Sequence, residues 1–244
     1  MKHLAWFLPF WIFVTLGTAS TESDPPTVGE AKARFEKIDR QLNDLWAMLK
    51  EKLPPARFAT VKDDQRGWLE YRDRLALSPS YSGAPSDEKA ARQSREYYST
   101  AASLMEDRIL WLNSWLAEEP ASLTGSWTDS HGGSIEIVER DGQIFFLIQV
   151  VRGPTAHVGA LSGVARWNSP IGWFSDKGRE KDKEDETNLA FHLEGGGLTL
   201  RGANTSFYHG ARAYFDGDYR RTGELDGRRQ TDVVKMAKAG EVPE

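Results

Sequence analysis

The sequence contains no cysteine among its 244 residues. This absence excludes disulfide bridges, thiolate metal sites and thiol nucleophiles, so the fold must depend on packing and hydrogen bonding. A clustered basic segment is also missing, because lysine and arginine number 15 against 18 aspartates and glutamates in residues 20–119, and again 15 against 18 in residues 120–244. With a formal charge of −5, the chain lacks the basic surface that phosphates require. We therefore predict no nucleic-acid partner.

Long apolar runs are equally scarce, and the longest extends from Leu4 to Leu16. Lys2 precedes it, and the small residues of 17–19 follow, which is typical of a secretory signal peptide over residues 1–19 with cleavage after Ala19. The run is about 13 residues long, shorter than the roughly 20 that span a bilayer. We therefore expect an exported protein, in the periplasm, in the cell envelope or secreted, with no stable membrane anchor after cleavage.

Catalytic motifs are absent as well. No Gly-x-Ser-x-Gly sequence is present, and Gly195-Gly196-Gly197 lacks the following helix and lysine of a phosphate-binding loop. The histidines beyond residue 19 fall in or beside four different predicted strands, without the short spacing of a zinc site. They are His131, His157, His192 and His209. We therefore predict no enzyme activity, no metal and no cofactor.

What the sequence does contain is a helical pattern in its N-terminal half. Apolar residues recur at steps of three and four from Phe35 to Leu53, where Pro54-Pro55 ends the first predicted helix. A second stripe runs from Phe58 to Leu75, and a third extends from Ser86 to Trp115. The pattern predicts a three-helix bundle, with the first two helices antiparallel.

Three polar residues interrupt these stripes, namely Gln65, Arg72 and Arg108. A buried charge is costly without a partner, and the acceptors available on the helices are Asp39, Asn43, Asp73 and Glu106. One interpretation is a buried polar network that fixes how the helices pack. The alternative is a binding groove, with walls formed by Trp68, Tyr71, Arg72 and Arg108.

From Leu123 the period changes to two, and Asp141-Gly142 is a strong hairpin signal between two alternating segments. About eight short strands over residues 123–222 predict an antiparallel barrel or sandwich, with a calycin-like barrel preferred. The expected strands lie at 124–130, 134–140, 143–151, 157–168, 171–175, 188–193, 198–202, 205–208 and 212–221. Residues 223–244 lack any period and are expected to form a mobile tail. The predicted class is α+β, with helices followed by a β domain.

Residues 28–118 resemble the LprI-like lysozyme inhibitor family of exported bacterial proteins. The resemblance is carried by Leu53-Pro54-Pro55, by the run from Gln65 to Asp73 (QRGWLEYRD) and by Glu106-Asp107-Arg108. It implies a small helical domain without catalysis. Members of that family usually have two cysteines at positions that fall here near Ala76 and Thr100, and this chain has neither.

These observations together predict an exported, non-enzymatic binding protein of the lysozyme-inhibitor type. Its partner would be a cationic lysozyme or another envelope protein, and the pattern leaves the oligomeric state open. One alternative is a β barrel that binds a small apolar or glycan ligand, with the helices as a docking module. Another is an envelope hydrolase with converging carboxylates. The candidate binding or network residues are Gln65, Trp68, Tyr71, Arg72, Asp73 and Arg108.

Overall fold

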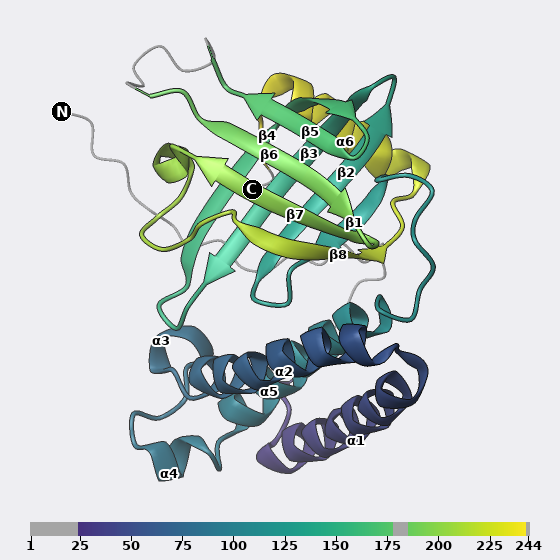
Figure 1. Cartoon of the computed structure of the whole chain (residues 1–244). Helices are drawn as coiled ribbons and strands as arrows, with labels where there is room; N and C mark the ends of the chain where they lie inside the picture. The colour runs from purple at the N-terminus through teal and green to yellow at the C-terminus, as the bar shows by residue number, and fades with distance from the viewer. Residues whose placement is uncertain (1–23, 178–184, 243–244) are drawn as a thin grey trace, which may run out of the picture.

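The computed structural model describes residues 24–177 and 185–242. A helical unit comes first and an antiparallel β barrel follows, so the α+β class predicted from the sequence is confirmed (Figure 1). The predicted signal peptide and its cleavage site at Ala19 lie outside the described residues. No helix in the described ranges is both long and apolar enough to cross a membrane.

Five helices form the first unit. They are α1 (Val28–Lys52), α2 (Pro55–Ala76), the short α3 (Pro79–Ser82) and α4 (Glu88–Ala91), and α5 (Arg95–Asn113). The sequence sets both ends of α1, because Thr27 and Glu30 form a reciprocal capping box and the helix ends just before Pro54. Pro55 then opens α2 at its first turn, where a missing backbone N–H costs nothing. Helices α1 and α2 both pack on α5.

The third predicted helix is interrupted. A continuous helix from Ser86 was expected, but α4 ends at Ala91 and α5 starts only at Arg95. The physical reason is a second N-cap, since the Ser94 side chain accepts a hydrogen bond from the backbone N–H of Tyr97 and so starts a new helix. The long helix α5 still buries the predicted apolar face, including Met105 and Trp111.

Eight strands of the described residues close into a barrel, so the sandwich alternative is wrong. Every neighbouring pair is antiparallel, and β1 pairs with β8 to complete the closure. The strands are β1 (Gly125–Thr128), β2 (Gly133–Arg140), β3 (Gln143–Arg152), β4 (His157–Asn168), β5 (Ile171–Ser175), β6 (Asn188–Glu194), β7 (Gly197–Ala203) and β8 (Gly217–Gly223). Two expected strands differ, since Thr205–Tyr208 is the 3-10 helix η1 and β8 begins at Gly217 instead of residue 212. A strand start at 212 is disfavoured because Arg212 has a left-handed backbone, with φ of 65°.

Aromatic side chains occupy the interior of the barrel. Phe146 contacts Phe174 and Phe191 at ring-centroid distances of 5.1 and 5.2 Å. Strand glycines make this packing possible, because a Cβ at Gly163 would lie 2.4 Å from the Phe174 ring. Trp127, Leu198 and other inward-facing residues are fully buried in the same cluster. The interior is therefore a packed core, which removes the main support for a ligand inside the barrel.

Residues 227–239 form a helix, so the prediction of a mobile tail is wrong there. Helix α6 (Gly227–Ala239) starts at Asp226, whose side chain accepts from the backbone N–H of Arg229 at 2.7 Å. Its apolar residues, including Val233 and Ala237, pack on the outer face of β2 and β3. An apolar patch on that face, formed by Val138, Phe145 and Leu147, supplies the burial that stabilises the helix.

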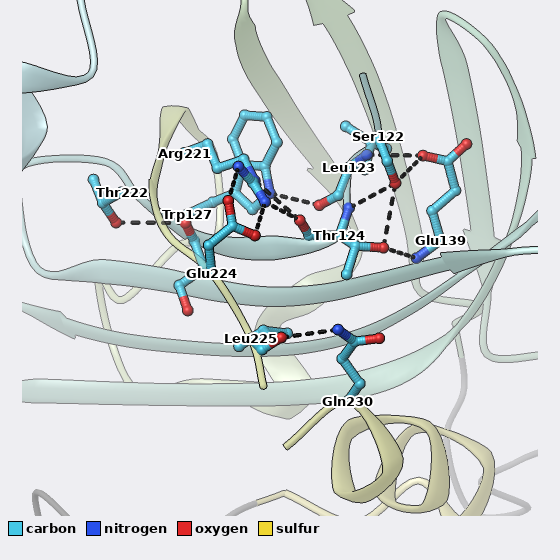
Figure 2. A network of polar contacts seen from close by, with 11 residues as sticks. Ser122, Leu123, Thr124, Trp127, Glu139, Arg221, Thr222, Glu224, Leu225 and Gln230 are labelled. Atoms are coloured by element: carbon cyan, nitrogen blue, oxygen red, sulfur yellow. Dashed lines mark hydrogen bonds and ion pairs between the residues drawn. The ribbon is translucent and has the colours of Figure 1, made fainter. Parts of the chain in front are cut away.

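A polar network closes the end of the barrel where β1 begins and β8 ends (Figure 2). The guanidinium of Arg221 donates from Nε and Nη2 to the carbonyl oxygen of Thr124, at 2.9 and 2.6 Å, and it also pairs with Glu224. Glu139 accepts from the backbone N–H of Leu123 at 2.8 Å, and the indole of Trp127 donates to the Leu123 carbonyl at 2.8 Å. These bonds anchor the segment that enters the barrel from the helical unit.

Candidate functional site

Arg108 of α5 lies at the centre of the predicted polar cluster and is completely buried. Its Nε donates to the side-chain oxygen of Gln65 at 2.8 Å, and its Nη1 donates to Asp64 at 2.8 Å. Burial lowers the pKa of Arg108 from its ordinary value, and the Asp64 carboxylate counteracts that change. The two partners lie side by side on α2, so this cluster fixes the packing of α2 on α5.

Two tryptophan rings complete the surroundings of this cation. The guanidinium carbon of Arg108 lies 4.3 Å from the ring centroid of Trp111 and 5.2 Å from that of Trp68. Trp68 is only 1% exposed. A ring that is buried in this way cannot line an open groove, so the structure gives Trp68 and Arg108 the geometry of a network.

Arg72 and Asp73 form an adjacent pair closer to the surface. Nε and Nη2 of Arg72 donate to one Asp73 oxygen at 3.0 and 2.7 Å, and Arg92 approaches the other oxygen at 3.6 Å. Arg72 also lies 5.8 Å from the ring centroid of Trp68, which joins it to the Arg108 cluster. The other expected acceptors are engaged elsewhere, since Glu106 pairs with Arg34 of α1 and Asn43 donates to Asp39 at 3.1 Å.

Tyr71 packs at the edge of the same apolar core, but its hydroxyl is directed away from this cluster. Its hydroxyl donates to the carbonyl oxygen of His131, in the β1–β2 loop of the barrel, at 2.9 Å, and the two rings meet edge to face at 5.0 Å. Burial raises the pKa of Tyr71 well above its ordinary value, so the hydroxyl stays a donor. Tyr71 therefore joins the helical unit to the barrel.

Hydrogen bonds and an ion pair hold the barrel side of this junction. Asp129 accepts from the backbone N–H groups of His131 and Gly133 at 2.9 and 2.7 Å, and it forms an ion pair with Arg152 at 2.5 Å. Arg152 also donates to the His131 carbonyl at 2.8 Å. The loop that receives Tyr71 is thus also held by contacts from within the barrel.

A second junction involves Arg220 of β8, which sequence reasoning missed. Arg220 donates to the side chain and to the carbonyl oxygen of Ser114, both at 3.1 Å, and its guanidinium carbon lies 4.3 Å from the ring centroid of Trp115. Ser114 caps the C-terminus of α5, where unpaired carbonyls favour a cation. Burial and the nearby Arg57 lower the pKa of Arg220 to about 10. A cavity of about 220 Å³ lies beside this contact.

The described residues contain no group of three or more histidine, aspartate or glutamate side chains that could hold a metal ion. The four histidines of the β half do not converge, since His131 lies at the Tyr71 junction while His209 bonds with Thr205 at 2.9 Å. The site residues missed by sequence reasoning are Asp64, Ser114, Asp129, Arg152 and Arg220. Only Asp64 had a usable signal, because it directly precedes Gln65 on the same helix.

Residues 19–112 match the family described as lysozyme inhibitor LprI. This match confirms the resemblance predicted from the helical half, and it covers well under half of the chain. It includes α1, α2 and nearly all of α5, and it ends before the barrel. No curated protein and no solved structure matches the chain.

Proposed function

We propose that this chain is an exported, non-enzymatic binding protein that inhibits a muramidase of the lysozyme type. The observation that carries the proposal is the match of residues 19–112 to the lysozyme inhibitor family. The first 19 residues support export, because they have the pattern of a signal peptide. We place the protein in the periplasm, in the cell envelope or outside the cell.

Charge supports a cationic partner. The chain has a formal charge of −5, so long-range attraction would guide a strongly basic muramidase towards it. The contact itself would form on the helical unit, because that is the part which matches the family. Leu69 of α2 and Leu110 of α5 are 40% and 54% exposed, and both can lose water against a partner.

The test is a lysis assay with purified residues 20–244 and c-type lysozyme, in which the clearing of a cell-wall suspension is followed with time. Micromolar chain should slow clearing, and added salt should weaken the effect because it screens the attraction. Full lysozyme activity at a large excess of the chain would contradict the proposal.

A second readout separates enzyme inhibition from shielding of the wall. The same mixtures are tested with a short soluble oligosaccharide substrate and by calorimetric titration of lysozyme with the chain. A true inhibitor slows cleavage of both substrates and binds the enzyme when no substrate is present. Slower clearing of the suspension alone would show that the chain covers the wall, and the inhibitor proposal would then fail.

A further inference from the structure

One sector of the barrel's outer surface carries large apolar side chains in contact with water. Helix α6 packs against β2, β3 and β4, and α5 approaches β8, so β5, β6 and β7 face away from the main helical contacts (Figure 1). On this sector Trp173 is 53% exposed and Ile171 is 49% exposed. Both belong to β5, and their side chains point outward because the alternate residues Gly172 and Phe174 are buried.

The strand register determines what surrounds the two side chains. Trp173 pairs with Arg166 of β4 on one side and with Ala190 of β6 on the other. Ile171 pairs with Asn168 and His192 in the same way. Since alanine carries only a methyl group, the β6 side of the indole remains uncovered. The result is a small apolar platform with polar groups along both edges.

These polar groups have no partners among the residues that the structure describes. Across residues 24–177 and 185–242, the side chains of Arg166, Asn168 and His192 make no hydrogen bond or ion pair. Arg201, on the outer face of β7, differs because it pairs with Asp218 at 3.7 Å. Within the described ranges, Arg166 is thus a cation without an acidic partner, directly beside an exposed tryptophan.

We propose that this platform binds a carboxylate-bearing saccharide. A sugar ring has an apolar face that fits against the Trp173 indole and hydroxyl groups that Asn168 and His192 can bond. Its carboxylate would pair with the Arg166 guanidinium, whose planar fork of N–H groups can donate to both carboxylate oxygens. The positive charge of Arg166 is therefore complementary to the carboxylate of the saccharide, although the chain as a whole is acidic.

The size of the platform favours a saccharide over a protein. A stable protein interface buries about 800 Å² on each partner around an apolar core. Here the exposed apolar part of the β5 face consists of Ile171 and Trp173, and polar side chains flank it directly. That area matches one or two sugar rings. This binding activity goes beyond inhibition of a muramidase and does not depend on it.

The experiment measures binding of the full mature chain to soluble oligogalacturonate, an acidic probe, and to chitohexaose, a neutral one, by calorimetric titration. We expect the acidic probe to bind more tightly. Trp173→Ala should weaken binding of the acidic probe by about tenfold or more, because the stacking surface is lost. Arg166→Gln should remove most of the preference for the acidic probe and leave stacking in place.

The matched control is Tyr214→Ala, which removes another exposed aromatic residue, 56% exposed, from a different part of the barrel. It should bind both probes as the unmodified chain does, and unchanged melting temperatures would show that all variants fold. Equal binding by Trp173→Ala and the unmodified chain would overturn the proposal, as would failure of the unmodified chain to bind either probe. Trp173→Ala should still inhibit lysozyme, because the platform lies outside the helical unit. If the unmodified chain did not inhibit lysozyme but bound the acidic probe, only the earlier proposal would be refuted.

Discussion

Removing Asp64 should destabilise the helical unit more than removing Arg108, although the two side chains form one ion pair. The reason is their unequal burial, because the Asp64 side chain is 25% exposed and that of Arg108 is fully buried. Asp64→Ala leaves a buried guanidinium with Gln65 as its remaining polar partner, which costs about 3–5 kcal/mol. Arg108→Met leaves a carboxylate that can turn to water and keeps apolar volume beside Trp68, so it should cost only about 1 kcal/mol.

The assay is urea unfolding of the full chain, with helix content followed by far-ultraviolet circular dichroism. The double variant Asp64→Ala with Arg108→Met should recover most of the stability lost in Asp64→Ala, since no buried charge remains. The control is Asp63→Ala, whose side chain is 79% exposed and lies 3.8 Å from Arg66, and we expect a change within about 0.5 kcal/mol. If Arg108→Met were the more damaging change and the two effects added, the contact of the guanidinium with the tryptophans, and not its charge, would hold the helices together.

Three further predictions concern the barrel and the junction. Gly163→Ala should destabilise the barrel by about 1–3 kcal/mol, because the new Cβ would lie 2.4 Å from the Phe174 ring. The control is Gly67→Ala, which should be neutral or stabilising because no atom lies within 4 Å of the new Cβ. Thermal unfolding of the two variants measures the difference. Val233→Asp should detach α6 from the barrel, because the substitution buries an unpaired carboxylate. Faster tryptic cleavage near Arg229 would report the detachment. The control is Thr231→Asp, which places the same side chain at an exposed position of α6. Arg220→Gln should lower the stability of the helical unit by about 1–3 kcal/mol, because the C-terminus of α5 loses a charged hydrogen-bond donor. In scanning calorimetry the helical unit should then unfold at a lower temperature than the barrel, as a separate transition.

The architecture could be predicted from the sequence because each half has a clear period. The step pattern from Phe35 to Leu53 corresponds to the buried face of α1, and the Asp141-Gly142 signal corresponds to the turn between β2 and β3. Helix α6 was missed for a physical reason, since its apolar stripe is short and most of its stabilisation comes from the β2–β3 surface. Local signals for it were present, because Asp226 is an N-cap residue and Gly240 a left-handed C-cap with φ of 73°.

The candidate site was predictable in its composition and not in its pairing. A buried arginine such as Arg108 is costly without a carboxylate partner, and the sequence contains several carboxylates at helical spacing. Asp64 is the observed partner, whereas Glu106 contacts Arg34 instead. The Arg220 junction could not be predicted, because it joins residues 106 positions apart through the relative placement of the helices and the barrel.

The run from Gln65 to Asp73 has two contact faces, and this constrains where a partner can bind. Gln65, Trp68 and Arg72 follow steps of three and four, so they share the face that meets α5. Tyr71 is one residue before Arg72 and therefore points about 100° away, towards the barrel loop at His131. Leu69 lies about 160° around the helix from Tyr71 and is exposed. Because the barrel occupies the Tyr71 side, a partner of α2 must approach from the side of Leu69, and any shift of α2 along α5 would move Tyr71 relative to His131.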